Sequence, residues 1–132
     1  MSQQPPAPYA PMTLKDLSGH LGRAEDDQLR WRLVAEFLEE YRWEESPGRL
    51  RLLAEEPPTT GDERWDTFLA ALAEHLALRD RRSEPDWAEA RTLRIFWFPF
   101  NTRAARVDAV VHAPVAFRRR GIFVAPQELE VA

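Results

Sequence analysis

Three histidines are the first candidates for chemistry in this chain, because imidazole is the side chain whose ordinary pKa lies near neutrality. They are His20, His75 and His112. His75 lies in a stretch with a strong helical pattern, where a metal site would need a second ligand three or four residues away on the same face. Positions 71, 72, 78 and 79 hold Ala, Leu, Leu and Arg. We therefore expect no metal site, and a histidine at the surface or boundary of a helix.

His112 ends a second stretch that we expect to be helical, where a protonated imidazole stabilises the last carbonyl groups. With Arg106 it also matches the loose arginine–histidine spacing of small helical ribonucleases, in which the two side chains act on a phosphodiester. In a chain with 3 histidines and 17 arginines (all but Lys15 of its Lys+Arg total), about one such spacing is expected by chance. A ribonuclease using Arg106 and His112 stays an alternative, and its mark would be cleavage of total RNA that His112→Ala abolishes.

The sequence lacks the other common catalytic constellations. It has no cysteine, hence no thiolate nucleophile, disulfide framework or zinc ribbon. Its five glycines are scattered and form no phosphate-binding loop, and no nucleophile elbow surrounds any serine. Glutamate pairs such as Glu39 and Glu40 are ordinary on solvated helix surfaces. We expect a protein without catalytic activity of its own and without a cofactor.

An aromatic run and a run of three arginines are the strongest candidates for a binding surface. Successive side chains of an extended chain alternate between faces, so part of the aromatic run should be exposed. Tryptophan, tyrosine and arginine dominate the energetics of protein interfaces. The predicted partner-binding residues are Phe96, Trp97, Phe98, Phe100, Arg118, Arg119 and Arg120. Two structural interpretations stay open: the rings can close the core of a small domain, and the arginines can stabilise the carboxyl end of a helix.

Charge is divided unevenly along the chain. Residues 13–90 hold 19 acidic and 11 basic residues, a balance of −8, whereas residues 91–132 hold 3 acidic and 7 basic residues, a balance of +4. The net charge of −4 argues against general binding to nucleic acid, since each neutralised phosphate needs a basic side chain. A nucleic-acid-binding regulator using the basic C-terminal segment stays a further alternative, recognisable by binding that weakens steeply with salt.

Periodicity and capping signals predict a mainly α, single small helical domain over residues 13–132, after a flexible proline-rich tail over residues 1–12. Residues 93–100 are expected as a short strand or an extended loop, so one short strand pair near the C-terminus is possible. Leu50 and Leu53 are expected to face inward, and Ala105, Val107, Val110 and Val111 are available for packing. The expected helices cover residues 13–22, 25–43, 47–56, 62–80 and 101–112, with helical turns after Pro85, Pro114 and Pro126.

The N-terminal residues and the hydropathy of the chain bear on its location. The start, MSQQPPAPYAPM, has neither the basic region nor the apolar region of a secretory signal. No apolar run approaches the roughly 20 residues that span a bilayer. We expect a cytoplasmic protein that does not enter the membrane.

Three stretches resemble a family of antitoxin or regulator proteins from high-GC bacteria, encoded beside nucleotidyltransferase-like toxins. They are VAEFLEEYRWE (residues 34–44), EEPPTTGDERWDTFLAALAEHLALRD (55–80) and FWFPFNTRAARVDAVVHAPVAFRRRGIFV (96–124). The similarity covers roughly residues 30–130, and APVAFRRRGIFV is its most distinctive part.

The resemblance implies a protein that neutralises a partner protein by binding it directly, without catalysis. Members of the family often carry a helix-turn-helix domain ahead of this region, but fewer than 30 residues precede it here, so DNA binding is not carried over. The glycine–serine pair and spaced aspartates of the toxin are also missing. The chain would therefore be the partner of a nucleotidyltransferase-like protein rather than the transferase.

Overall fold

The computed structural model describes residues 10–130 and is mainly helical, as the sequence predicts. Residues 1–9 of the expected N-terminal tail lie outside the described residues. Met12, the last residue of that tail, belongs to the domain. The backbone N–H of Met12 donates to Glu40 at 3.1 Å, and the Met12 side chain packs against the core. The helices are α1 (Leu14–Arg23), α2 (Asp27–Trp43), α3 (Ser46–Ala54), α4 (Glu63–Arg79), α5 (Arg103–His112) and α6 (Val115–Arg118), with 3-10 turns at Asp86–Ala88 and Pro126–Leu129.

Side-chain caps fix where the longer helices begin. Thr13 and Asp16 form the predicted capping box of α1, in which each side chain accepts from the backbone N–H of the other residue. Asp26 caps α2, and Thr102 caps α5 by accepting from the backbone N–H of Ala105 at 3.1 Å. Each cap satisfies a backbone donor that the first turn of a helix leaves without a partner.

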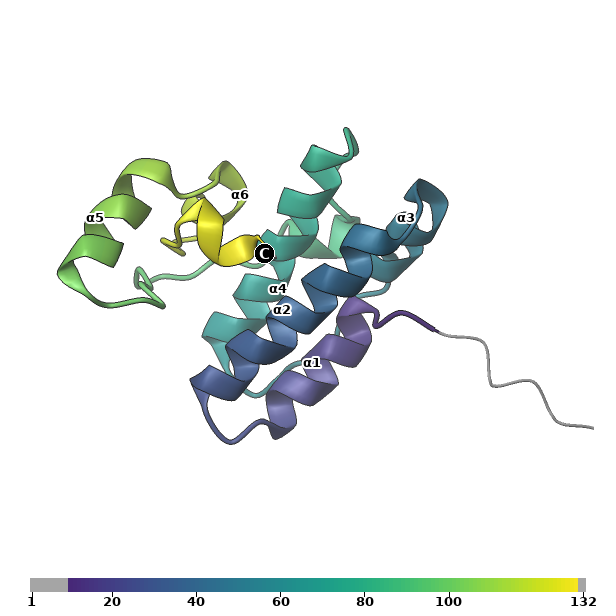
Figure 1. Ribbon diagram of the computed structural model, residues 1–132, viewed down its shortest axis with the longest axis horizontal. Helices are drawn as coiled ribbons and strands as arrows, with labels where there is room; N and C mark the ends of the chain where they lie inside the picture. Colours follow the sequence, from purple (N-terminus) through teal and green to yellow (C-terminus); the bar gives the residue numbers. More distant parts are fainter. Residues whose placement is uncertain (1–9, 131–132) are drawn as a thin grey trace, which may run out of the picture.

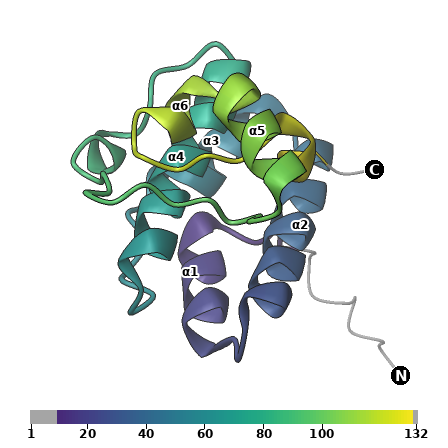
Figure 2. The same cartoon turned by 90° about the vertical axis from the view of Figure 1, so that its left-hand side faces the viewer.

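Helix α4 is the centre of the molecule and is buried along most of its length. Helices α1 and α2 form an antiparallel pair beside it, and α3 lies at the end of the molecule opposite α5 (Figure 1). The view from the side shows α5 and α6 with the connecting chain lying across one face of this bundle (Figure 2). The fold is therefore a helical bundle with a C-terminal layer applied to one side.

Aromatic rings join these layers. Trp65 of α4 makes edge contacts with Trp31 of α2 at 5.2 Å between ring centroids, and with Trp97 of the C-terminal layer at the same distance. Phe68, one turn further along α4, contacts Phe117 of α6 at 5.3 Å. Such ring pairs add to the free energy of burying the rings themselves, so these contacts hold the C-terminal layer on α4.

The possible strand pair near the C-terminus is reduced to one isolated parallel bridge in the part of the chain that the structure describes. The backbone N–H of Trp97 donates to the Gly121 carbonyl at 2.8 Å, and the N–H of Phe123 donates to the Trp97 carbonyl at 2.9 Å. Gly121 has a φ of +84°, and a Cβ there would lie 3.4 Å from Leu93 and Phe96. The positive φ favours glycine at this position, because residues with a Cβ rarely adopt it.

Leu50 does not face inward as expected. Helix α3 buries Leu52 and Leu53, and Leu50, which lies 200° from Leu52 around the helix, is 52% exposed. The spacing of Leu50 and Leu53 is compatible with one helical face, but the packing of α3 turns a neighbouring face toward the core.

A buried ion-pair network fixes the C-terminal layer to α4. Arg120 is 1% exposed, and its two Nη atoms donate to Glu74 of α4 at 2.7 Å and to Glu84 of the following loop at 2.6 Å. Arg119 donates to the same two carboxylates. Burial alone would raise the pKa of Glu74, but the hydrogen bonds from Arg119 and Arg120 outweigh it and hold that pKa below its ordinary value. Glu74 is therefore ionised near neutral pH.

We predict that Glu74→Gln lowers the free energy of unfolding by about 3 kcal/mol, because it leaves a buried guanidinium with half of its compensating charge. Urea denaturation at neutral pH measures the change. Glu36→Gln on the exposed face of α2 is the control, and we expect it to change stability by less than about 0.5 kcal/mol. Equal stability of the two variants would contradict the structural role given to the network.

Candidate functional site

The structure separates the seven residues predicted to bind a partner. Trp97 is 8% exposed and packs on Trp65, and Arg120 is held in the buried network. Neither side chain presents a surface to another molecule. Trp97 is part of the core, and Arg120 has a structural role. We therefore assign neither of them to an interface.

The other two arginines are also engaged within the chain. Arg118 donates to the carbonyl groups of Val110 and Val111 at 2.9 and 3.3 Å, and so satisfies the last turn of α5. Arg119 forms ion pairs with Glu74 and Glu84. The charge of Arg119 is therefore paired, whereas Arg118 is held by carbonyl groups and has no ion-pair partner within residues 10–130. In both cases the side chain connects parts of this chain, which makes the arginine run a mainly structural feature.

Phe96 is the most exposed ring of the aromatic run. Phe98 stacks on Phe123 at 5.1 Å between centroids, and Phe100 packs against Trp31 at 4.9 Å. Phe96 makes an edge contact with Phe123, yet it is 66% exposed, and Ile95 beside it is more exposed still. Of the predicted aromatic residues, Phe96 is therefore the one that remains available to a partner.

The structure reveals a second apolar surface, on α5. We call it the α5 face and define it as Ala104, Val107, Val110 and Val111. Val107 and Val111 are 60% and 61% exposed, and Val110 is about half exposed. The three valines lie within an arc of about 100° around the helix axis. They form a continuous apolar strip, and Val107 and Val111 also line a shallow hollow between Arg103 and His112.

The inner side of α5 is made of small residues. Ala109 is its one buried residue, and Ala105 and Asp108 line the same hollow as Phe100, Phe123 and Val124. Among the helices that the structure describes, none packs extensively on α5. A surface helix normally turns its larger apolar side chains toward the core. Helix α5 does the reverse, because it buries alanine and exposes valine.

The charges at the start of α5 are also unusual. Its first turn holds no acidic residue, and Arg103 and Arg106 lie near the amino end, where the helix dipole disfavours positive charge. The Arg106 guanidinium stacks over the Phe98 ring at 4.6 Å. Among the described residues Arg103 has no ion-pair partner, so its charge is available beside the α5 face.

Arg106 and His112, the pair of the ribonuclease alternative, do not converge. They are six positions apart on α5, which places them about 120° apart around the helix axis and about 9 Å apart along it. The nearest carboxylate oxygen of Asp108 lies 4.0 Å from His112, one turn away. The alternative stays an untested prediction, and the geometry adds no support to it.

No group of three or more metal-ligating side chains occurs within residues 10–130. None of the described helices is long and apolar enough to cross a membrane.

Comparisons were made with protein-family models, curated proteins and solved structures. None of the three finds a match. The functional argument therefore rests on the residues of the chain.

Sequence reasoning found the apolar residues of α5 but not the direction in which they point. The sequence does contain a signal for this direction. Ala105, Ala109 and Ala113 recur every four residues, and such small side chains mark the side on which a helix can approach a neighbour closely. The valines occupy other positions of the same helix. Read together, the two patterns indicate that the alanine side faces the domain.

His75 lies at the boundary of the core, as expected, with its ring 5.6 Å from that of Phe117. Burial and, secondarily, Arg79 lower its pKa to about 4, against an opposing effect of Glu130. An unfolded chain binds a proton at this histidine near pH 6.5, whereas the folded chain does so only near pH 4. Stability is therefore lost as pH falls through this window.

We predict that His75→Gln removes part of the acid destabilisation between pH 6.5 and pH 4, on the order of 2 kcal/mol across the window. Denaturant unfolding at several pH values measures it. His20→Gln, which makes the same substitution at an exposed position of α1, is the control. Identical profiles for the natural chain and His75→Gln would show that His75 is not the responsible group.

Proposed function

We propose that this chain is a non-catalytic protein-interaction module of antitoxin type, which binds and neutralises a partner protein through the α5 face. The observation that carries the proposal is the inverted packing of α5, which leaves three valines in solvent. An exposed, continuous apolar surface on an otherwise well-packed domain is typical of a protein interface. The resemblance of residues 30–130 to antitoxin-like proteins supports the same function.

The apolar surface can supply useful binding energy. Fully burying a valine side chain contributes about 1.5 kcal/mol or more. Because the α5 valines are already about half covered, each would contribute about 1 kcal/mol in an interface. Phe96 and Ile95 offer further exposed apolar surface within the same C-terminal layer.

The charges around α5 indicate the chemistry of the partner. Arg103 and Arg106 are the charged residues of its first turns, where the helix dipole disfavours them. Carboxylates on a partner would stabilise both arginines. We therefore propose a partner with an apolar groove bordered by acidic residues, which the resemblance suggests is a nucleotidyltransferase-like toxin in the cytoplasm.

The test uses the purified chain and the product of the gene adjacent to its own, with affinity and stoichiometry measured by calorimetry. We expect saturable binding, and we expect Val107→Ser with Val111→Ser to weaken it about 30-fold, since about 2 kcal/mol of apolar burial is lost.

Leu29→Ser with Leu78→Ser, at exposed leucines on α2 and α4, is the matched control and should bind normally. Absence of binding to the neighbouring product would reject the proposed partner. Binding that survives the valine changes but is lost in the leucine control would remove the α5 face from the proposal.

A further inference from the structure

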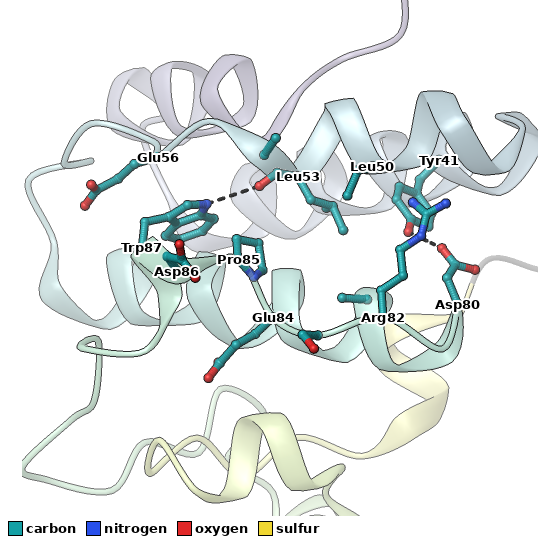
Figure 3. A pocket seen from close by; sticks show the side chains of 13 residues that line it. Tyr41, Leu50, Leu53, Glu56, Asp80, Arg82, Glu84, Pro85, Asp86 and Trp87 are labelled. Carbon is teal, nitrogen blue, oxygen red and sulfur yellow. Dashed lines mark hydrogen bonds between the residues drawn. The ribbon is translucent and has the colours of Figure 1, made fainter.

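A cavity of about 510 Å³ lies on the α3 side of the molecule, away from the α5 face. It is open to solvent and is lined by the C-terminal half of α3, the end of α4, Tyr41 of α2 and the segment over residues 82–87 (Figure 3). Its volume falls within the range of about 300–1,000 Å³ that is usual for small-molecule sites. The function proposed above does not use this cavity.

The central part of the cavity is apolar and held in place. Leu50, Leu53 and Pro85 lie between its two ends in Figure 3, and the exposed side chain of Leu50 belongs to this wall. The indole N–H of Trp87 donates to the Leu53 carbonyl at 3.1 Å, and Arg91 lies 4.9 Å from the Trp87 ring centroid. These contacts fix the tryptophan, so the apolar wall exists without a ligand.

Three of the five charged side chains that line the cavity already have partners of opposite charge. Asp80 pairs with Arg49 and accepts from the Tyr41 hydroxyl, and Glu56 pairs with Arg91. Glu84 points away from the cavity in Figure 3, into the network with Arg119 and Arg120. These three carboxylates belong to the protein's own structure.

The remaining two are Arg82 and Asp86, and neither has an ion-pair partner within residues 10–130. The Arg82 guanidinium donates to the hydroxyl and carbonyl of Ser46, which hold it beside Asp80 at one end of the cavity. Asp86 lies at the other end, next to Trp87. The cavity therefore has a cation without an ion-pair partner at one end, an anion without one at the other end, and an apolar wall between them.

From this arrangement we infer that the cavity binds a short apolar peptide with both ends free. The C-terminal carboxylate of the peptide pairs with Arg82, its ammonium group pairs with Asp86, and its apolar side chains cover Leu50, Leu53 and Pro85. Hydrogen bonds between charged groups are the stronger ones in proteins, and they give orientation as well as affinity. In a single amino acid the two charges are adjacent, whereas Arg82 and Asp86 lie toward opposite ends of the cavity in Figure 3.

The test measures binding of leucyl-leucyl-leucine to the full chain by NMR, following the Trp87 indole resonance. We expect saturable binding, and we expect acetylation of the peptide's amino end or amidation of its carboxyl end to weaken it about tenfold each. Leucine itself should bind far more weakly than the tripeptide. Lack of a saturable shift with the tripeptide, or equal binding of the doubly blocked peptide, would overturn the inference.

Variants assign each end of the peptide. In Asp86→Asn the acetylated and free peptides should bind equally, and in Arg82→Gln the amidated and free peptides should bind equally, because the partner of the blocked group is absent. Glu89→Gln and Arg81→Gln, at exposed neighbouring positions, are the matched controls and should retain both tenfold differences. Acetylation that weakens binding as much in Asp86→Asn as in Glu89→Gln would refute the assignment of Asp86.

Val107→Ser with Val111→Ser should leave peptide binding unchanged, because the α5 face is separate from the cavity. Failure of the peptide experiments would therefore leave the proposed partner binding intact. Failure of the partner-binding experiments would likewise leave the proposed peptide binding intact.

Discussion

The buried guanidinium of Arg120 is the interaction on which the rest of the structure depends. It lies between a carboxylate of α4 and a carboxylate of the following loop, and it also donates to the carbonyl groups of Ala116 and Ala88 at 2.9 and 3.1 Å. Its Nε is the one buried side-chain nitrogen or oxygen without a hydrogen-bond partner among residues 10–130. A charge this deeply buried is tolerated only where its partners are correctly placed. The network therefore selects one position for α6 and for the loop before it.

Both candidate surfaces follow from that position. Helix α5 is connected to the fixed part of the layer through Arg118, which caps its last turn, and through the rings beneath Ala109. Glu84, which pairs with Arg119 and Arg120, belongs to the same loop as Arg82 and Asp86. The arginine run therefore has a structural role rather than a role in binding a partner. It fixes the position of α5 on one side of α4 and the position of a cavity wall on the other side.

The sequence predicted the helices well because the signals that define them are local. Capping residues such as Thr13, proline positions and apolar periodicity all act within a few residues, and the helix bounds agree within a few residues with those expected. The candidate site was harder to predict because it depends on which face of each helix is covered. Val107 and Leu50 are apolar residues in helices, and only their neighbours in space decide that they are exposed.

The arginine run shows the same limit more sharply. Arg118, Arg119 and Arg120 are indistinguishable as a sequence pattern, yet one caps a neighbouring helix, one is partly exposed in a salt bridge, and one is buried. The partners that decide this, Glu74 and Glu84, lie more than 30 residues earlier in the chain. A long-range ion pair leaves no periodic signal, so the interface interpretation of the run could not be separated from the structural one before the fold was known.

Native-state hydrogen exchange of the unmodified chain tests the central claim most directly, because it compares helices within one molecule. The account predicts that the amides of α5, from Val107 to His112, exchange through local opening with low protection. The amides of α4 from Phe68 to Leu76, and those of Phe117 and Arg120, should require global unfolding. Protection of the α5 amides equal to that of the α4 amides would mean that α5 is fully packed in the isolated chain, and would contradict the claim that it is held out for a partner.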